Sequence, residues 1–314
     1  MLQRVRVVDI RRETADIVAL ELVAADDAPL ADYTPGAHID VHVAPGLIRQ
    51  YSLYEPPGAT SYFIAVKREA QSRGGSAGIH AGVKPGDVLT ISIPRNNFTL
   101  AASASHSILL AGGIGVTPIA SMAGHLRNIG ASYAIHYFAR SAKDAALLAR
   151  LERDHNERLH PHYLDPAEVA ALLRKIIPTY QAGLHVYLCG PTAFMNLAQE
   201  TMRNWPAESV HIEHFVNELP GNGQMAGAFT VELARSGQRF VVGANESIVE
   251  VLARNGVDVP TSCEQGVCGT CITKVLEGRP DHRDVYMTDE EHAAGDQITP
   301  CVSRCLDDRL VLEL

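Results

Sequence analysis

Apolar and polar residues alternate along the first hundred residues with the two-residue period of half-buried β-strands. Pro-Gly turns separate the alternating runs at Pro35-Gly36, Pro45-Gly46 and Pro85-Gly86. Many short strands at this spacing are typical of an antiparallel barrel, which we expect over residues 1–103. Its predicted strands include Arg4–Ile10, Ile17–Val23, Ala37–Val43, Tyr62–Lys67 and Val88–Ile93.

The pattern changes near Ser107, where short apolar runs begin to alternate with helical ones. Asp165 and Pro166 are good N-cap and first-turn residues for one of the helices. The alternation predicts an α/β domain over residues 104–220, with a parallel sheet covered by helices. The predicted strands are Ser107–Ala111, Ser132–Phe138, His185–Leu188 and Val210–Phe215, and the other helices are Pro118–Asn128, Lys143–Arg153 and Thr192–Asn204.

A polar, turn-rich linker at Glu218–Gln224 separates these segments from the last module, residues 226–314. Phe229–Leu233 and Arg239–Val242 are predicted to form a hairpin around Ser236-Gly237, followed by one short helix at Ser247–Arg254. A hairpin, a helix and a cysteine-rich loop indicate a compact α+β fold.

Four cysteines of this last module have the spacing C-x4-C-x2-C followed by a distant fourth: Cys263, Cys268, Cys271 and Cys301. This is the plant-type spacing of [2Fe–2S] ligands. Structural zinc sites favour two short C-x2-4-C pairs instead, and disulfides belong to secreted chains. A Rieske centre needs two histidine ligands, and none lies in the loop. The spacing therefore predicts a [2Fe–2S] electron-transfer centre.

Bulk composition fits an electron-transfer protein of the cytoplasm. The 314 residues, 46% of them hydrophobic, suffice for two or three domains. No stretch approaches the roughly 20 apolar residues that span a bilayer, and Met1–Val8 alternates without the apolar core of a signal peptide. A net charge of −9 argues against nucleic-acid binding. The last 89 residues carry 15 acidic and 8 basic side chains, and thus −7 of that charge, which suits either solubility or steering toward a redox partner.

A [2Fe–2S] cluster moves one electron at a time, whereas a nicotinamide gives two, so a flavin is needed between them. In the first segment, Arg49-Gln50-Tyr51-Ser52 ends a strand and offers a phosphate-binding arginine beside a ring and a hydroxyl. Arg73-Gly74-Gly75-Ser76-Ala77-Gly78 offers backbone amides at a predicted helix start, and Ala65-Val66-Lys67 offers backbone groups for the flavin edge. Taken alone, Arg49–Ser52 fits ordinary strand residues better, and Arg73–Gly78 fits a plain flexible turn equally well.

A dinucleotide site is expected in the second segment. Ala111-Gly112-Gly113-Ile114-Gly115-Val116-Thr117-Pro118 joins a strand to a helix, although its spacing is not G-x-G-x-x-G. Cys189-Gly190-Pro191-Thr192 occupies the same strand-to-helix position later in the sheet. The Cys189 thiol can line a nicotinamide pocket or simply be a small buried side chain.

Together, Arg49–Ser52, Gly112–Pro118, Cys189–Pro191 and the C-terminal cysteines resemble, in that order, the phthalate dioxygenase reductase family, which includes reductases of vanillate O-demethylases. The resemblance covers essentially the whole chain. It implies a flavin-binding barrel, an NAD-binding domain and a β-grasp ferredoxin domain in one polypeptide. It also implies that NADH reduces FMN, which passes single electrons through the cluster to a separate Rieske-type oxygenase or O-demethylase that acts on aromatic compounds.

The same resemblance assigns individual residues. The residues implied for FMN are Arg49, Tyr51, Ser52, Ala65, Val66, Lys67, Arg73, Gly74, Gly75, Ser76, Thr117 and Phe215. The residues implied for the nicotinamide nucleotide are Gly113, Gly115, Arg140, Ser141, Cys189, Gly190 and Pro191. Ser52, Thr117, Cys189 and Phe215 would surround the site of hydride transfer, although Phe215 also suits a hydrophobic core. Cys305 has no ligand role in the family pattern and is expected to pack.

FMN is favoured over FAD by the resemblance, and NADH over NADPH because Tyr137–Ser141 contains one arginine rather than a basic cluster. Hydride transfer from NADH to flavin needs no acid or base, so no catalytic triad is assigned. An alternative is the same electron-transfer chain serving a cytochrome-type oxygenase or a quinone. A zinc-stabilised binding module with a degenerate nucleotide fold is the alternative from another class, and visible absorption separates it from a flavin and iron–sulfur protein.

Overall fold

The computed structural model describes residues 1–26, 28–44, 47–69, 74–215 and 227–314. The chain forms two compact units, Met1–Glu213 and His214–Leu314, and each is described by itself. Three predicted features lie outside the described residues: the turn Pro45-Gly46, Arg73 and the linker Glu218–Gln224. The boundaries predicted for three domains stay a prediction.

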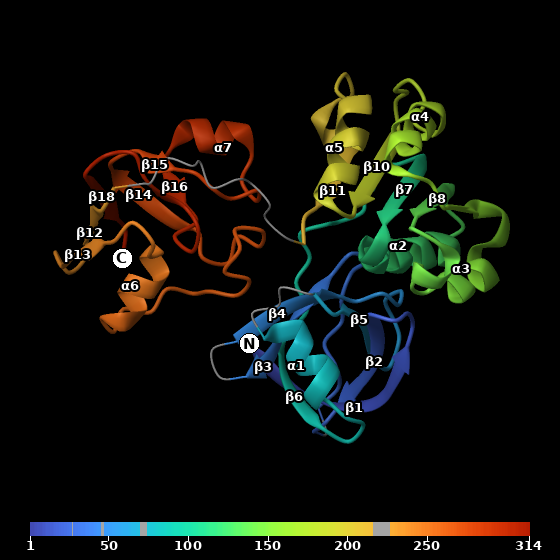
Figure 1. Ribbon diagram of the computed structural model, residues 1–314, viewed down its shortest axis with the longest axis horizontal. Helices are drawn as coiled ribbons and strands as arrows, with labels where there is room; N and C mark the ends of the chain where they lie inside the picture. Colours follow the sequence, from blue (N-terminus) through green and yellow to red (C-terminus); the bar gives the residue numbers. More distant parts are fainter. Residues whose placement is uncertain (27, 45–46, 70–73, 216–226) are drawn as a thin grey trace. The chain divides into compact units, whose positions relative to one another are not determined.

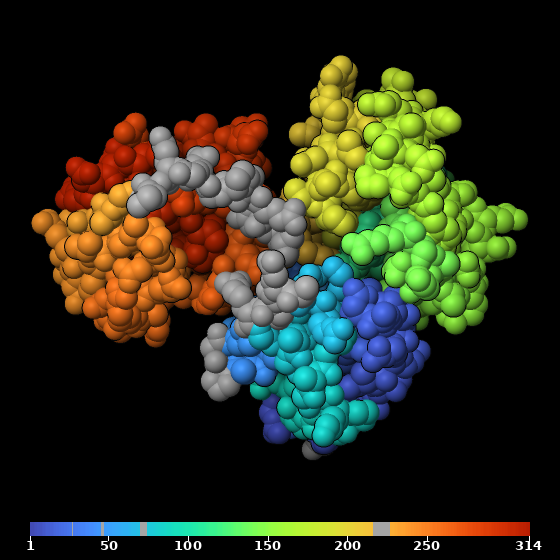
Figure 2. All heavy atoms as spheres, in the orientation of Figure 1, coloured from blue at the N-terminus to red at the C-terminus, as the bar shows by residue number. Residues whose placement is uncertain are grey.

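An antiparallel sheet of six strands, in the order β4-β3-β6-β1-β2-β5, curls into the predicted barrel (Figure 1). A bridge between Leu53 and Ile64 joins its two ends, so the barrel is nearly closed. Helix α1 (Gly75–Gly82) contacts β3, β4 and β5, on the face of the barrel seen in Figure 2. The strands are β1 (Leu2–Arg12), β2 (Ile17–Ala24), β3 (His38–Ala44), β4 (Leu47–Ser52), β5 (Tyr62–Lys67) and β6 (Val88–Ser92).

The barrel forms because alternate residues of each strand face its interior. Along β1, Val5 and Val7 are fully buried while Arg4 and Arg6 are exposed. Burial of such an aliphatic side chain contributes about 1.5–3 kcal/mol. Residues from β2, β3, β5 and β6 complete one hydrophobic cluster with them, and the strands expected from the alternation are confirmed.

A parallel sheet of five strands, in the order β11-β10-β7-β8-β9, follows the barrel. Central strand β7 lies between β8 and β10. The strands that follow β7 are added first on one side of it, as β8 and β9, and then on the other side, as β10 and β11. Ligands bind open α/β sheets at such a switch point. Figure 1 shows α4 and α5 together on one side of the sheet and α2 and α3 on the other. The strands are β7 (His106–Gly112), β8 (Tyr133–Phe138), β9 (Leu159–His162), β10 (Leu184–Cys189) and β11 (Val210–Glu213), and the helices are α2 (Val116–Asn128), α3 (Leu148–His155), α4 (Pro166–Ile176) and α5 (Thr192–Thr201).

Two local predictions for this segment are corrected. The helix expected from Lys143 starts at Leu148 instead, because Leu147 has a left-handed backbone with φ of 61°. The amide of Leu147 donates to the Glu13 carboxylate at 3.0 Å, a contact across 134 residues. Strand β9 and its edge position were not expected from the sequence. The strand predicted to reach Phe215 ends at Glu213.

Side-chain contacts attach the parallel sheet to the barrel within the first unit. The Ser121 hydroxyl of α2 donates to the Glu55 carbonyl oxygen at 2.7 Å, and Arg150 of α3 forms an ion pair with the Glu55 carboxylate. The amide of Ala101 donates to the Tyr187 hydroxyl of β10 at 2.8 Å. The carboxyl edge of the parallel sheet is thereby fixed beside the barrel.

The second unit contains a sheet in the order β13-β12-β18-β14-β16 and a two-stranded sheet of β15 and β17. The predicted hairpin is confirmed, but the described residues form two helices rather than one. Both have capping boxes, Ser247 with Glu250 and Thr288 with Glu291. The elements are β12 (Phe229–Leu233), β13 (Arg239–Val242), α6 (Ile248–Arg254), β14 (Thr273–Glu277), β15 (Pro280–Asp281), α7 (Asp289–Ala294), β16 (Gln297–Ile298), β17 (Arg304–Cys305) and β18 (Arg309–Leu312). Within the part of the chain that the structure describes, no helix is both long and apolar enough to span a bilayer.

Candidate functional site

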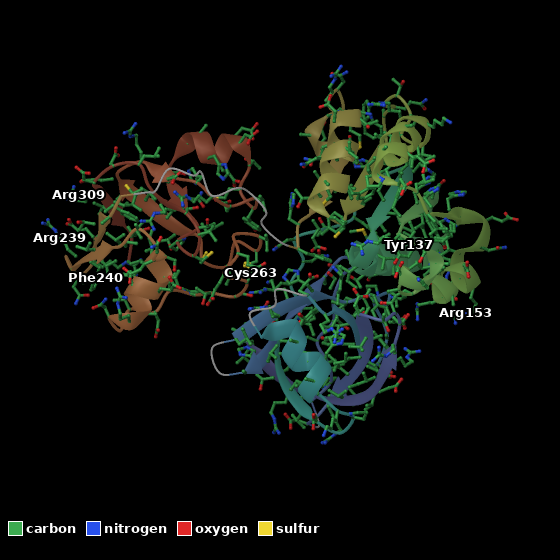
Figure 3. The ribbon with its side chains drawn as sticks, in the orientation of Figure 1. Tyr137, Arg153, Arg239, Phe240, Cys263 and Arg309 are labelled. Atoms are coloured by element: carbon green, nitrogen blue, oxygen red, sulfur yellow. The ribbon has the colours of Figure 1, made fainter. Side chains whose placement is uncertain are left out.

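The four predicted cluster ligands come together in the second unit. Cys263, Cys268 and Cys271 are buried in the loop between α6 and β14, where Figure 3 labels Cys263. Cys301, between β16 and β17, brings its Sγ to 3.3 Å from the Sγ of Cys271. All four are free thiols. The segment that carries Cys301 is distant in sequence, but it thus supplies the fourth sulfur atom beside the three-cysteine loop.

The loop between these cysteines is curved by residues with positive φ. Glu264, Gly266 and Gly269 have φ of 52°, 69° and 68°. At Gly269 a Cβ would lie 2.3 Å from the Tyr286 ring, so the ring rests directly on the backbone. Amide groups therefore turn toward sulfur, as the Gln265 N–H does toward Cys263 Sγ at 3.3 Å.

The chemistry of the four thiols suits a metal cluster. Hydrogen bonding with Cys263 lowers the pKa of Cys268 to about 5, and hydrogen bonding with Cys301 lowers the pKa of Cys271. Thiolate is the form that ligates metal. The same hydrogen bonds raise the pKa of Cys263 and of Cys301, so the thiolate form is favoured at Cys268. Four converging sulfur atoms fit a [2Fe–2S] cluster. Cys305 packs against the hydrophobic core instead, as expected.

In the first unit, the predicted phosphate-binding residues lie side by side. Arg49 in the middle of β4 reaches the start of α1, where a Cβ at Gly75 would lie 2.6 Å from Arg49 Cγ and 2.7 Å from its Nε. Gly74 precedes the helix with φ of 95°, and Ser76 is buried with its hydroxyl accepting from the Glu69 amide at 3.1 Å. An arginine beside the first turn of a helix can bind a phosphate group.

The remaining residues expected around the flavin line the same part of the barrel. Tyr51 is half-buried, and Ser52 is buried. On β5, Ala65 and Val66 are buried, with the Val66 carbonyl oxygen 2.9 Å from His80 Nε2. Lys67 forms an ion pair with Glu69 at 3.0 Å, which leaves its ammonium group at the rim.

Two glycine turns meet at the carboxyl edge of the parallel sheet. A Cβ at Gly115 would lie 2.3 Å from the Cys189 carbonyl oxygen, and one at Gly190 would lie 2.9 Å from Gly112 Cα. Pro191 also contacts Gly112. Gly113 has φ of 52°, and a Cβ there would meet no atom within 4 Å. The turn after β7 and the turn after β10 thus lie against each other and form one surface. On this surface the backbone of Gly113 has free space beside it.

A buried group connects this edge to the barrel. Glu213 of β11 is the register partner of Cys189 on β10, and the Ser52 hydroxyl from β4 interacts with its carboxylate. Burial raises the pKa of Glu213 to about 8, although the interaction with Ser52 acts in the opposite direction. Burial, with the Glu213 charge adding to it, also raises the pKa of the Cys189 thiol. Both groups are therefore protonated near neutral pH.

The four remaining predicted residues lie in three different places. Thr117 is buried and donates from its hydroxyl to the Ile114 carbonyl oxygen at 3.1 Å, within the turn after β7. Arg140 and Ser141 follow β8 at the same sheet edge, where the Ser141 hydroxyl donates to the Asp144 carboxylate at 2.6 Å. Phe215 belongs to the second unit.

Glu213 and Asp144 are functional candidates that sequence reasoning missed. Glu213 stands at the end of a predicted strand within His211-Ile212-Glu213-His214-Phe215, where only the aromatic residue was singled out. An acidic residue at the carboxyl end of a parallel strand is a usable signal. Asp144 gave no signal, because it lay inside a stretch predicted to be helix.

Comparisons with known proteins support the same organisation. Residues 231–306, which include all four ligand cysteines, match the 2Fe-2S iron-sulfur cluster binding domain. Residues 92–211 match the N-terminal domain of the dimethylamine monooxygenase subunit DmmA-like family.

Similar proteins span the whole chain. Vanillate O-demethylase oxidoreductase of Acinetobacter baylyi is 41% identical over 308 residues, covering 97% of this chain and 96% of that protein. The solved phthalate dioxygenase reductase is 37% identical with a TM-score of 0.77, covering 100% of this chain and 98% of that one. An intact type IV self-sufficient cytochrome P450 monooxygenase is 34% identical with a TM-score of 0.84, and this chain spans 41% of it. The chain is thus an oxidoreductase with a flavin- and nicotinamide-binding reductase fold joined to a [2Fe–2S] domain, and it belongs to the phthalate dioxygenase reductase-like family.

Proposed function

We propose that this protein is an NADH-dependent reductase that delivers electrons, through FMN and its [2Fe–2S] cluster, to a separate Rieske-type oxygenase or O-demethylase acting on aromatic compounds. The observation that carries the proposal is the interaction of Ser52 from the barrel with Glu213 of the parallel sheet, which is the register partner of Cys189. A flavin held by the barrel and a nicotinamide held by the sheet would adjoin at this point. When bound, the flavin supplies the conversion of a two-electron donor into a one-electron donor.

Residues of the barrel would hold the flavin. Arg49 and the first turn of α1 offer charge and backbone amides to one phosphate group, which suits FMN. Ser52 and Thr117 would lie toward the reacting edge of the ring, with Phe215 as the stacking residue. The residues proposed for FMN are Arg49, Tyr51, Ser52, Ala65, Val66, Lys67, Arg73, Gly74, Gly75, Ser76, Thr117 and Phe215.

Residues at the sheet edge would orient the nicotinamide. The turns after β7 and β10 offer backbone, and the neutral Cys189 thiol and protonated Glu213 carboxyl place no charge beside a hydride path. Proton transfer is not required for hydride transfer, so Glu213 is a positioning residue that keeps its proton below pH about 8. The residues proposed for the nucleotide are Gly113, Gly115, Arg140, Ser141, Cys189, Gly190 and Pro191.

NADH is proposed over NADPH because of Asp144. Its carboxylate is held by Ser141 close to Arg140, at the end of β8 where an adenosine ribose binds in such folds. A carboxylate can accept hydrogen bonds from ribose hydroxyls but repels a 2′-phosphate. The segment after β8 thus offers an acid as well as one arginine.

Cys263, Cys268, Cys271 and Cys301 are proposed as the cluster ligands, since their sulfur atoms converge and their loop supplies amide donors. A cytochrome-type oxygenase is a second candidate acceptor. Its basis is the 34% identity to 41% of the length of an intact type IV self-sufficient cytochrome P450 monooxygenase.

Cofactor release and reconstitution test the proposal. Heat-released flavin is identified by chromatography, and the protein is then mixed with NADH and either a purified Rieske-type oxygenase or a cytochrome P450. We expect FMN, and product formation with the Rieske-type enzyme above a no-reductase control. FAD in the extract would refute the cofactor assignment, and turnover with the cytochrome alone would refute the proposed partner.

A further inference from the structure

A buried carboxylate and two imidazoles form a group in the second unit that the electron-transfer path does not use. The Asp284 side chain has no exposed surface, and those of His282 and His292 are 11% and 25% exposed. The two rings stack with centroids 4.3 Å apart. Their candidate ligand atoms and one Asp284 oxygen all lie within 4.8 Å of one another.

The Asp284 carboxylate accepts four hydrogen bonds from residues other than the two histidines. The amides of Tyr286 and Met287 donate to Oδ2 at 3.2 and 2.9 Å. The hydroxyls of Thr299 and Ser303 donate to Oδ1 at 3.1 and 3.4 Å. Such outer partners fix the orientation of a carboxylate that ligates a metal.

His282 lacks the partners that a buried imidazole normally has. Both of its ring nitrogens are inaccessible to solvent, and neither has a partner at hydrogen-bond geometry among the described residues. The backbone of His292 approaches the ring without meeting that geometry. A buried polar group without a hydrogen-bond partner lowers the stability of the folded state by about 1–3 kcal/mol. A metal ion bound to the His282 ring would supply the partner and explain why the ring is buried here.

The distances match the spacing of metal ligands better than that of hydrogen bonds. His292 Nε2 lies 3.3 Å from both Asp284 oxygens, which is long for a hydrogen bond. Two ligands at about 2.0–2.1 Å from one tetrahedral metal lie roughly 3.3–3.4 Å apart. His282 Nδ1 is 3.9 Å from Asp284 Oδ1. Because the two imidazole planes are within 18° of parallel, one ring must turn out of the stack for both to reach the same ion.

We propose that His282, Asp284 and His292 bind one divalent transition-metal ion, with Zn²⁺ as the preferred occupant and water as the fourth ligand. Two imidazoles and one carboxylate, with water in the fourth position, form a ligand set found in zinc sites, and imidazole nitrogen suits Zn²⁺. None of the three residues is a cluster cysteine, so zinc and iron occupy different ligands.

Metal binding would brace a segment that supports the cluster loop. The Val285 amide donates to the Gly266 carbonyl oxygen at 3.0 Å, and a Cβ at Gly266 would lie 3.0 Å from Asp284 Cα. His292 lies on α7, whereas His282 follows β15. The ion would therefore tie α7 to the segment packed against Gly266, and we assign it a structural role.

Equilibrium dialysis of the holoprotein against Zn²⁺, followed by measurement of zinc and iron, tests the site. The wild-type protein should bind one zinc while retaining two iron atoms per chain. His292→Gln and His282→Gln should each weaken zinc binding at least about 100-fold, because loss of an outer partner alone costs 10–100-fold. His160→Gln, in the separate stacked group of His136, His160 and His162, is the matched control and should bind normally.

Zinc-edge X-ray absorption is measured on the zinc-loaded wild-type protein, so its result does not depend on whether the variants fold. Nitrogen and oxygen ligands without sulfur are expected. Equal zinc binding by wild type and His292→Gln, loss of binding in His160→Gln, or a sulfur shell around zinc would each overturn the proposal. His292 is partly exposed, so His292→Gln remains informative even where the buried His282→Gln fails to fold.

Discussion

Gly115 lies so close to Cys189 that a Cβ on the glycine would sit 2.3 Å from the cysteine carbonyl oxygen and 2.4 Å from its carbonyl carbon. Real Cβ atoms do not approach backbone this closely. The turns after β7 and β10 can therefore share one surface only if residue 115 has no side chain. Because both turns belong to the proposed nucleotide site, their separation should control nucleotide binding.

Gly115→Ala should push these turns apart. Overpacking of this kind costs about 1–3 kcal/mol of folding free energy, and the KM for NADH should rise while the cluster absorption is unchanged. Thermal unfolding and NADH-dependent flavin reduction measure the two effects. Gly82→Ala is the control, because a Cβ there meets no atom within 4 Å; equal behaviour of the two variants would show that the contact at Gly115 is unimportant.

The pH dependence of stability should report on Glu213. Its pKa is raised to about 8 by burial in the folded protein, whereas an unfolded glutamate has a pKa of about 4.3. The folded state thus binds the proton more tightly, so this group's contribution to stability is full below pH about 4.3 and is lost as pH rises through about 8.

Glu213→Gln removes that titration and keeps the shape. The melting temperature of wild type, relative to this variant, should fall between pH 5 and pH 9. Ser52→Ala deletes the interaction that lowers the pKa of Glu213, so it should raise that pKa further and extend the fall to higher pH. If the difference in melting temperature between wild type and Glu213→Gln stayed constant with pH, the Glu213 carboxyl group would not be buried in solution.

Local patterns in the sequence are sufficient to predict most of the fold. Alternation along β5 (Tyr62–Lys67) and the Asp165-Pro166 start of α4 each depend on neighbouring residues, so strand and helix were predicted correctly there. Cysteine spacing likewise predicted ligands that the structure brings together. These signals are local, or nearly so.

Other features depend on contacts between distant residues. The start of α3 is set by Leu147, whose amide binds the carboxylate of Glu13 from the barrel. Strand β9 is four residues long, includes Pro161 and exists because β8 pairs with it. The raised pKa of Glu213 requires burial of its carboxyl group, which a sequence does not display.

Cys268→Ser should separate the two halves of the electron path. With one ligand lost, the visible absorption of the cluster and reduction of one-electron acceptors that draw on it should disappear. Flavin reduction by NADH should persist at wild-type rate, because Cys268 belongs to the second unit. Cys305→Ser, which alters a packing cysteine, should keep both activities; loss of flavin reduction in a folded Cys268→Ser protein would contradict the proposed order.

Asp144→Ala should relax the preference for NADH. Removal of about 1.4 kcal/mol of repulsion toward a 2′-phosphate corresponds to a tenfold lower KM for NADPH. The ratio of kcat/KM values for the two nucleotides measures this. Glu200→Gln changes an exposed acid on α5 and should leave the ratio unchanged, and an unchanged ratio in Asp144→Ala would remove Asp144 from the specificity argument.

Anaerobic titration of the purified protein with NADH, followed by visible absorption and electron paramagnetic resonance, tests the central claim most directly. A chain that divides electron pairs into single electrons should bleach both flavin and cluster bands, and it should develop the paramagnetic signal of a reduced [2Fe–2S] cluster. A colourless protein without iron, or one whose cluster stays oxidised after the flavin is reduced, would contradict the account.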